Sequence, residues 1–346
     1  MKRKNFLKAV GLAAAASTIP LRNIYPDLSP VERIKPPRLK PGDTIGLVAP
    51  GSYIDGQQLN ESIKNLYELG FNVVYNNSIL SKNGYFSGPD RQRASDVNQM
   101  FYRDDVKGIV CARGGYGCTR ILPLLNYNVI KTNPKVLIGY SDVTSLLYGI
   151  YKETGLVCFH GAVGISSYNN FTVDYFKKTL MDPVDKLLLR NPEPESPDEE
   201  FQPYTIQGGI AKGELIGGNL SVVVSLIGTP YDVDTKNKII FLEEMSEDPY
   251  RIDRMLTQMR MAGKFEAAAG VALGIFKDCI PSEKTSFDSS FTLKEVLKNR
   301  LADLNIPVVY GMSFGHVKNK FILPAGLNAE LDSSNQTITL LETAVA

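Results

Sequence analysis

The chain has 346 residues, of which 43% are hydrophobic, and this is sufficient for a large core or for two domains. Its 38 basic and 37 acidic residues nearly cancel, so the composition gives no indication of nucleic-acid binding. Four cysteines without a CxxC pair and only 2 histidines exclude a zinc finger and an HExxH metal site. Any mechanism that needs an imidazole must therefore use His160 or His316.

The start of the chain has the pattern of an export signal. MKRKNFLKAVGLAAAASTIP joins a basic start to a short apolar run and then to small residues. The apolar run is far shorter than the roughly 18 residues of a membrane span, so we expect no stable membrane insertion. RKNFLK resembles a twin-arginine signal with Lys4 in place of the second arginine, which leaves the route open between twin-arginine and Sec export. We assign residues 1–25 to this signal and expect a periplasmic protein, the alternative being a frayed amphipathic helix.

Short apolar strands alternate with helices over residues 38–175. The patterns predict strands at 44–49, 71–76, 108–113 and 135–140, and helices at 61–70, 91–106 and 143–150. Alternation at this spacing is typical of βαβ units and a parallel sheet. We therefore predict an N-terminal α/β domain over 38–175.

The next stretch is rich in proline and acidic residues, with NPEPESPDEEFQP at 191–203. This composition predicts a solvated linker over residues 176–206. Strands and helices alternate again over 207–340, which predicts a second, smaller C-terminal α/β domain.

KVLIGYSDVTSLLYGI, residues 135–150, places a serine where a strand stops and a helix begins. Ser141 or Asp142 could cap that helix. Ser141 could instead be a nucleophile on a strand–turn–helix elbow, with Gly139 leaving room for the turn. The helix start then offers free amide groups to a developing oxyanion. The stretch by itself leaves both interpretations open.

A glycine-rich loop, CARGGYG, follows the preceding predicted strand. Its backbone amides at Gly114, Gly115 and Gly117 could approach an anion, although an ordinary glycine turn has the same composition. The spacing is not that of a dinucleotide-binding G-x-G-x-x-G loop. Because neighbouring strand ends of a parallel sheet face one crevice, this loop could supply an oxyanion donor beside Ser141.

A catalytic serine needs a base and an orienting carboxylate. His316 follows a predicted strand in a glycine-flanked loop and is the better candidate base, whereas His160 lies among apolar residues. Glu243 ends the predicted strand KIIFLE, an unfavourable place for an acid unless it is exposed or paired. The alternative acids nearby are Glu244, Glu247 and Asp248.

Eight motifs occur in order between residues 38 and 331. They are GLVAPGS, GYFSGPDRQRASDVNQMF, CARGGYG, IGYSDVTSLL, FHG, GGNLSVV, FLEEMSEDPYRIDRML and GMSFGHVKNKFILPAG. Together they resemble the LD-carboxypeptidase family, serine peptidases that include murein-recycling enzymes and microcin C self-immunity peptidases. The resemblance implies a two-domain α/β fold whose N-terminal parallel sheet, with flanking helices, is flavodoxin- or Rossmann-like.

The resemblance also implies a site. Carried over by motif, the triad is Ser141, Glu243 and His316, and the oxyanion donors are the Asp142 amide and either Gly114 or Gly115. The family implies no metal and no cofactor, and it implies a homodimer.

The expected function is release of a terminal D-alanine from a murein tetrapeptide by cleavage of an L–D bond. One alternative is a related peptidase acting on a microcin-C-type antibiotic or on another acylated amino acid. From a different class, a periplasmic two-domain ligand-binding protein fits the same domain pattern. A structural cell-wall adaptor has no support beyond the export signal.

Overall fold

The computed structural model describes residues 32–194, 196–281 and 288–346, and Glu32–Ala346 form one compact unit. The predicted export signal, residues 1–25, lies outside the described residues. Among the described helices, none has both the length and the apolar character that a bilayer crossing requires.

The first sheet has six strands in the order β12-β5-β4-β3-β1-β2. Its strands are β1 (Thr44–Val48), β2 (Asn72–Val74), β3 (Val106–Cys111), β4 (Val136–Gly139), β5 (Cys158–His160) and β12 (Leu323–Ala325). β1 to β5 pair in parallel, and β12 returns from near the end of the chain to pair antiparallel with β5. The predicted N-terminal parallel sheet is confirmed.

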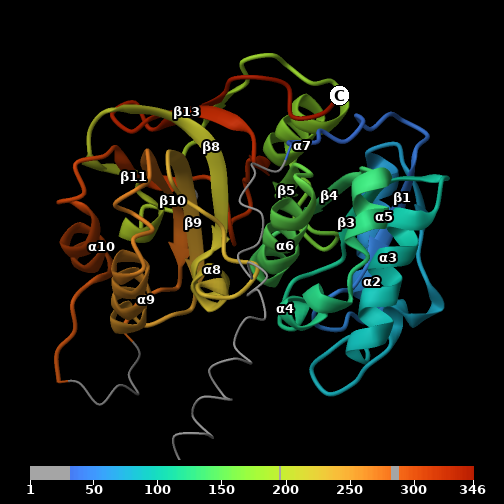
Figure 1. The fold of residues 1–346 in the computed structure, drawn as a ribbon. Coiled ribbons are helices and arrows are strands. Elements are labelled where there is room, and N and C mark those ends of the chain that lie inside the picture. Colours follow the sequence, from blue (N-terminus) through green and yellow to red (C-terminus); the bar gives the residue numbers. More distant parts are fainter. Residues whose placement is uncertain (1–31, 195, 282–287) are drawn as a thin grey trace, which may run out of the picture. The chain divides into compact units, whose positions relative to one another are not determined.

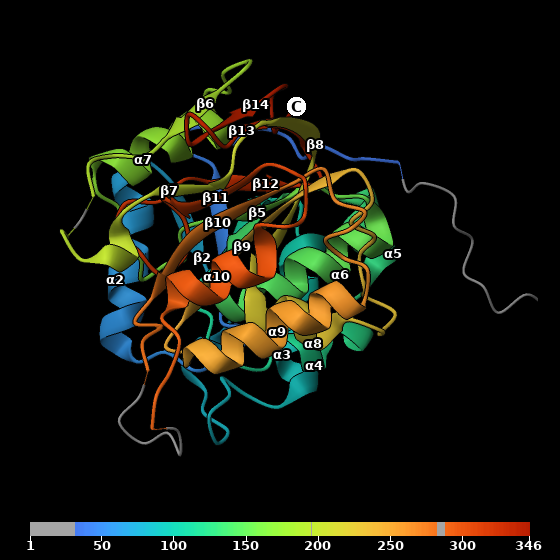
Figure 2. The same ribbon diagram turned by 90° about the vertical axis from the view of Figure 1, so that its left-hand side faces the viewer.

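Helices cover both faces of this sheet, which explains its apolar strands. They are α2 (Gly56–Glu68), α3 (Asp90–Tyr102), α5 (Tyr127–Thr132), α6 (Thr144–Thr154) and α7 (Asn170–Phe176). Alternate strand residues share one apolar cluster with α3, α5 and α6 and another with α2 and α7. Figures 1 and 2 show the ribbons of these helices around the strands. The shorter turns are η1 (Asn77–Leu80), α4 (Cys118–Ile121), η2 (Leu122–Leu124), η3 (Ser141–Val143), η4 (Lys177–Met181) and η5 (Glu199–Phe201).

The second sheet has eight strands in the order β6-β14-β13-β8-β9-β10-β11-β7. Its strands are β6 (Leu188–Arg190), β7 (Tyr204–Gln207), β8 (Ile210–Asn219), β9 (Lys238–Met245), β10 (Gly270–Lys277), β11 (Val308–Met312), β13 (Asn328–Asp332) and β14 (Thr337–Leu340). Its central strands β8 to β11 are parallel and the outer pairs are antiparallel. One face packs against α8 (Leu220–Leu226), α9 (Pro249–Met261) and α10 (Leu293–Leu301).

The helix after the Ser141 turn joins the two sheets. Thr144, the first residue of α6, accepts a hydrogen bond through Oγ1 from the Asn219 amide at 3.0 Å. A Cβ on Gly218 would lie 2.4 Å from the Thr144 hydroxyl oxygen, so only glycine permits this approach. The carboxyl ends of β4 and β8 are therefore fixed against each other, and β9 lies beside β8.

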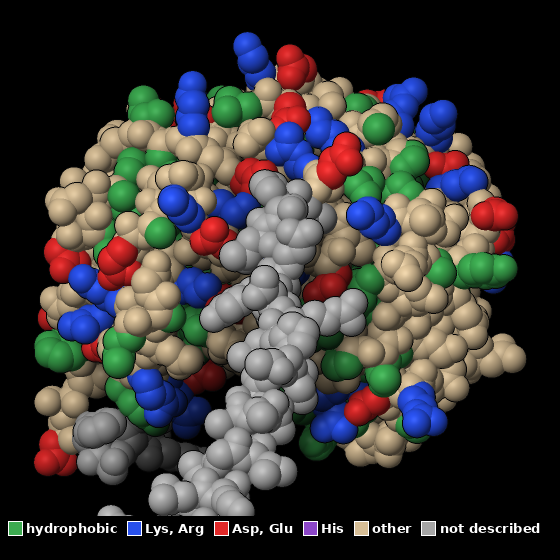
Figure 3. All heavy atoms as spheres, viewed as in Figure 1, with side chains coloured by type: hydrophobic (Ala, Val, Ile, Leu, Met, Phe, Trp, Pro, Cys, Tyr) green, Lys and Arg blue, Asp and Glu red, His purple; other side chains and the backbone are tan. Residues whose placement is uncertain are grey.

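The predicted linker and the predicted C-terminal domain both contribute strands to sheets in which they were not expected. The predicted linker, 176–206, contributes β6 and most of β7 to the second sheet, and β12 joins the first sheet from within the predicted C-terminal domain. The boundaries 38–175 and 207–340 stay a prediction. On the face shown in Figure 3, basic and acidic side chains of the described residues are interspersed.

Candidate active site

Ser141 lies in the turn between β4 and α6 with a φ of 64°. Non-glycine residues rarely adopt this left-handed conformation, which costs on the order of 1–3 kcal/mol. Neither Ser141 nor Asp142 caps the turn or α6, so the capping interpretation is wrong. A Cβ on Gly139 would lie 2.7 Å from Val143 Cγ1, which shows how tight the turn is. The geometry is that of a strained elbow that presents its serine.

The RGGYG loop contacts this turn directly. A Cβ on Gly114 would lie 2.9 Å from Ser141 Cβ and 3.2 Å from the Asp142 amide nitrogen. The Asp142 carboxylate accepts a hydrogen bond from the Cys118 amide at 2.9 Å, and burial raises the pKa of this carboxyl. The Ser52 amide donates to the Gly114 carbonyl at 3.2 Å. The Asp142 side chain therefore holds the loop, while its backbone amide lies next to Gly114.

A buried arginine that the sequence analysis did not assign supports the same loop. Arg93 on α3 is 1% exposed and pairs with Asp90. Its guanidinium donates to the carbonyls of Gly88 at 3.1 Å and Gly117 at 2.9 Å, and to that of Pro50. A fork of fixed donors suits three separate carbonyls, which ties three loops together. Its place in the GPDRQR motif was the available signal, but composition alone does not separate it from surface arginines.

Glu243 and His316 form a close pair. Glu243 Oε2 lies 2.7 Å from His316 Nδ1; the Glu243 side chain is fully buried, and 16% of the His316 side chain is exposed. Gly315 has a φ of 97°, and a Cβ there would lie 2.6 Å from Glu243 Oε2. Glycine before His316 is therefore what allows the loop after β11 to approach the end of β9.

The charge state of Glu243 is set by its neighbours. Burial alone would raise the pKa of this carboxyl, but the two imidazoles of His316 and His160 more than offset burial and lower the pKa to about 2. Glu243 is therefore a buried anion at neutral pH. It can orient the His316 ring and stabilise an imidazolium.

The other candidate acids have different partners. Glu244 accepts hydrogen bonds from Asn219 Nδ2 at 2.9 Å and from the Ser221 amide at 2.8 Å, and burial raises its pKa. Glu247 and Asp248 lie within 3.5 and 3.9 Å of Arg251. Glu244 thus stabilises the start of α8, and the acids at 247 and 248 lie at the start of α9.

Tyr140 links the serine turn to His316. The rings of Tyr140 and His316 lie edge to face with centroids 4.9 Å apart, and Tyr140 directly precedes Ser141. Ser141 and His316 are both half-buried, whereas Glu243 is fully buried. The structure therefore brings the three predicted residues into one region, with the potential reacting groups accessible and the carboxylate enclosed.

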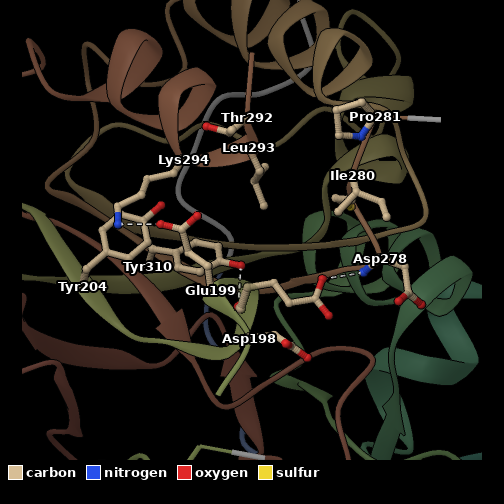
Figure 4. A pocket seen from close by; sticks show the side chains of 12 residues that line it. Asp198, Glu199, Tyr204, Asp278, Ile280, Pro281, Thr292, Leu293, Lys294 and Tyr310 are labelled. Carbon is tan, nitrogen blue, oxygen red and sulfur yellow. Dashed lines mark hydrogen bonds and ion pairs between the residues drawn. The ribbon is translucent and has the colours of Figure 1, made fainter. Parts of the chain in front are cut away.

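A cavity of about 380 Å³ lies elsewhere, and the described residues that line it include none of these three (Figure 4). Lys294 pairs with Glu199 at 2.8 Å, and the Asp278 amide donates to Glu200 at 2.9 Å. Burial raises the pKa of its Cys279 thiol to about 12, so no thiolate forms at neutral pH. This cavity lacks an activated nucleophile and is not the candidate active site.

The contact between the two loops predicts a sensitive position. Gly114→Ala is expected to lower kcat by about 10²–10³-fold, because a Cβ at 2.9 Å from Ser141 Cβ must separate the loop from the turn and displace an oxyanion donor. Steady-state kinetics check this. Gly56→Ala is the control, since a Cβ there meets nothing within 4 Å. Equal activities of the two variants would contradict the assignment of this loop.

A strained serine, preceded by a tyrosine that packs on a histidine held by a buried carboxylate, is consistent with the arrangement of a serine hydrolase. Residues 45–161 match the sequence model of the LD-carboxypeptidase N-terminal domain, and residues 212–331 match that of the LD-carboxypeptidase C-terminal domain. The chain belongs to the LD-carboxypeptidase family of serine peptidases.

Individual relatives agree with this assignment. The chain is 35% identical over 311 residues to the probable murein peptide carboxypeptidase of Bacillus subtilis, covering 88% of this chain and 94% of that protein. The muramoyltetrapeptide carboxypeptidase of Oxalobacter formigenes is 28% identical with a TM-score of 0.71, over 86% of this chain and 97% of that one. MccF in complex with glutamyl sulfamoyl guanosine is 25% identical with a TM-score of 0.82, over 90% and 99%. The protein is therefore a carboxypeptidase-type hydrolase with the predicted mixed α/β fold.

Proposed function

We propose that this protein is a serine carboxypeptidase that hydrolyses the L–D bond of a murein tetrapeptide and releases the terminal D-alanine. The observation that carries the proposal is the 2.7 Å contact between Glu243 and His316 beside the strained Ser141 turn. The murein peptide substrates named for two of the relatives support the choice of substrate.

In this mechanism His316 takes the Ser141 proton as the hydroxyl attacks the scissile carbonyl, and it then protonates the leaving amine. Glu243 keeps the proton of the neutral ring on Nδ1, which leaves Nε2 free to act as the base. Its negative charge stabilises the imidazolium that forms in each step. Water then releases the peptide from the acyl-enzyme by the same steps in reverse order.

The oxyanion would be stabilised by backbone amides. The Asp142 amide is one donor, because it follows the nucleophile at the start of η3. The carbonyl of Gly114 is taken by the Ser52 amide, and in a trans peptide the next N–H points the opposite way. We therefore assign the second donor to Gly115, whose amide is turned away from Ser52.

Peptides of defined length test the substrate. Incubation with murein tri-, tetra- and pentapeptides and mass detection is expected to show loss of one D-alanine from the tetrapeptide and an unchanged tripeptide. Matched tetrapeptides ending in L-alanine, or in a C-terminal amide, are expected to react at least about 10²-fold more slowly, since a misplaced scissile bond loses near-attack geometry. Cleavage of the amide at the tetrapeptide rate would show that the enzyme does not act as a carboxypeptidase.

The similarity to MccF favours a second candidate, a peptidase that acts on an acylated nucleotide. Glutamyl sulfamoyl guanosine, the ligand in that structure, is the direct probe. The predicted export signal argues against this function, because the antibiotic would have to be met in the cytoplasm. Faster turnover of the nucleotide conjugate than of the tetrapeptide would replace the first proposal with the second.

We also propose that the protein is exported to the periplasm and forms a homodimer. The signal pattern in residues 1–25 supports export, and the family resemblance supports the dimer. Recovery of the protein only from the cytoplasmic fraction of the cells would exclude export. A monomer mass by light scattering would exclude the dimer.

A further inference from the structure

His160, the last residue of β5, lies beside the active site but is only 1% exposed. It pairs in register with Gly139 of β4 and with Leu323 of β12. Its ring packs against Phe241 at 5.4 Å and against Tyr140 and Phe314 at 6.1 Å each, measured between centroids. The imidazole is thus enclosed by aromatic rings. It lies opposite Gly139 of β4, which is two residues before Ser141.

The polar atoms of this imidazole face one atom of the proposed triad. Within the described part of the chain, neither ring nitrogen of His160 has a hydrogen-bond partner, and the same holds for Glu243 Oε1. His160 Nε2 lies 3.8 Å from Glu243 Oε1. A bridging water needs about 2.8 Å on each side, so the gap is too small for one in line. Buried polar groups are nearly always paired, and a small side-chain movement makes these two atoms each other's partner.

After His316, the contact with His160 is the second one that can stabilise the negative charge of the buried Glu243 carboxylate. His316 occupies Oε2, and Gly315 packs against the same oxygen. Burial, and after it the negative charge of Glu243, raises the pKa of the neighbouring Glu244 carboxyl and of the Tyr140 hydroxyl. In the resting enzyme His316 must be neutral to act as a base, so a second donor to the buried anion is needed at that stage.

We propose that His160 is a positioning residue, which donates a hydrogen bond from Nε2 to Glu243 Oε1 so that each carboxylate oxygen is held by one imidazole. The inference rests on the proposed serine mechanism and extends it. The carboxylate cannot rotate away from His316 while Oε1 is held. The two histidines of the chain, one at the end of β5 and one in the loop after β11, then share a single acid.

His160→Leu and His160→Gln separate this role from packing, because the glutamine amide retains a donor where leucine has none. The readout is the rate at which a fluorophosphonate labels Ser141, which needs no peptide substrate. His160→Leu is expected to label about 10- to 100-fold more slowly at neutral pH. His160→Gln is expected to retain most of the rate. Phe314→Leu is the packing control, since it alters a ring against His160 without removing a donor.

The pH dependence of the labelling rate tests the direction of this effect. A donor to Glu243 favours the ionised form of the coupled Glu243–His316 pair, so its loss lets the pair take up a proton at higher pH. The acid limb of the labelling rate is expected to move up by about one pH unit in His160→Leu and to stay in place in Phe314→Leu. If the acid limb of His160→Leu stayed in place or moved to lower pH, the inference would be overturned. Labelling of Ser141 in the same experiment would leave the proposed function intact.

A measurement on the wild-type protein covers the case in which the variants do not fold. With 2 histidines in the chain, ring-nitrogen NMR gives only two sets of signals. His160 is expected to carry a proton on Nε2, and a proton on Nδ1 alone would overturn the inference. Failure of the wild-type protein to label at Ser141 would instead overturn the serine mechanism and this inference together.

Discussion

Replacing Ser141 by alanine is expected to lower kcat/KM for the murein tetrapeptide by about 10⁴- to 10⁶-fold. The hydroxyl is the only group of this residue that can attack the peptide carbonyl, and neither histidine nor glutamate replaces it. A fluorophosphonate is expected to add its mass to the wild-type protein and not to Ser141→Ala. Ser145→Ala is the matched control, because that hydroxyl is buried on α6 and donates to the Asp142 carbonyl. Wild-type release of D-alanine by Ser141→Ala would end the serine proposal.

The strained backbone at Ser141 also makes a prediction about stability. Alanine keeps the strain at φ 64°, so Ser141→Ala is expected to unfold at nearly the wild-type temperature. Ser141→Gly removes the strain and is expected to raise the free energy of unfolding by about 1 kcal/mol while activity is lost. A glycine variant no more stable than the alanine variant would show that the turn is not strained.

Replacing Glu243 by glutamine is expected to lower kcat by about 10⁴-fold with little change in KM. The side chain keeps its size, but its amide can donate to His316 Nδ1 and so favours the tautomer with the proton on Nε2. That ring cannot accept the Ser141 proton, and the imidazolium loses the carboxylate now 2.7 Å away. Steady-state kinetics of the purified variant measure both parameters.

Glu244→Gln is the matched control for this prediction. Glu244 is the next residue on the strand and is also buried, but it accepts its hydrogen bonds from Asn219 and from the Ser221 amide. Glutamine retains an acceptor there, so we expect reduced thermal stability and activity within about tenfold of wild type. If Glu244→Gln lost more activity than Glu243→Gln, the roles of the two acids would have to be exchanged.

Much of the fold follows from local patterns in the sequence. The predicted helix after Ser141, 143–150, occurs as α6 over Thr144–Thr154, and residues 143–150 are all buried. The predicted first strand, 44–49, and the predicted helix over 91–106 also occur, as β1 and α3. These elements are read correctly because short apolar runs bounded by glycine and proline mark them within a few residues.

Other features depend on tertiary contacts that spacing does not encode. Glu243 and Glu244 end a strand that is buried on both faces, so no alternation shows which acid faces His316. Ser141 adopts its positive φ in a turn against which Gly114, a residue of another loop, packs closely. His160 is fully buried, because β12 arrives from more than 160 residues away and pairs with β5.

The return of β12 to the first sheet also determines when the enzyme can become active. Residues 323–325 form the edge of the sheet that carries Ser141, so a growing chain lacks that edge until synthesis has passed residue 325. His316 is made only shortly before this strand. The proposed base and the closing strand are thus both added long after the proposed nucleophile, and a growing chain that has not reached residue 316 lacks a complete triad.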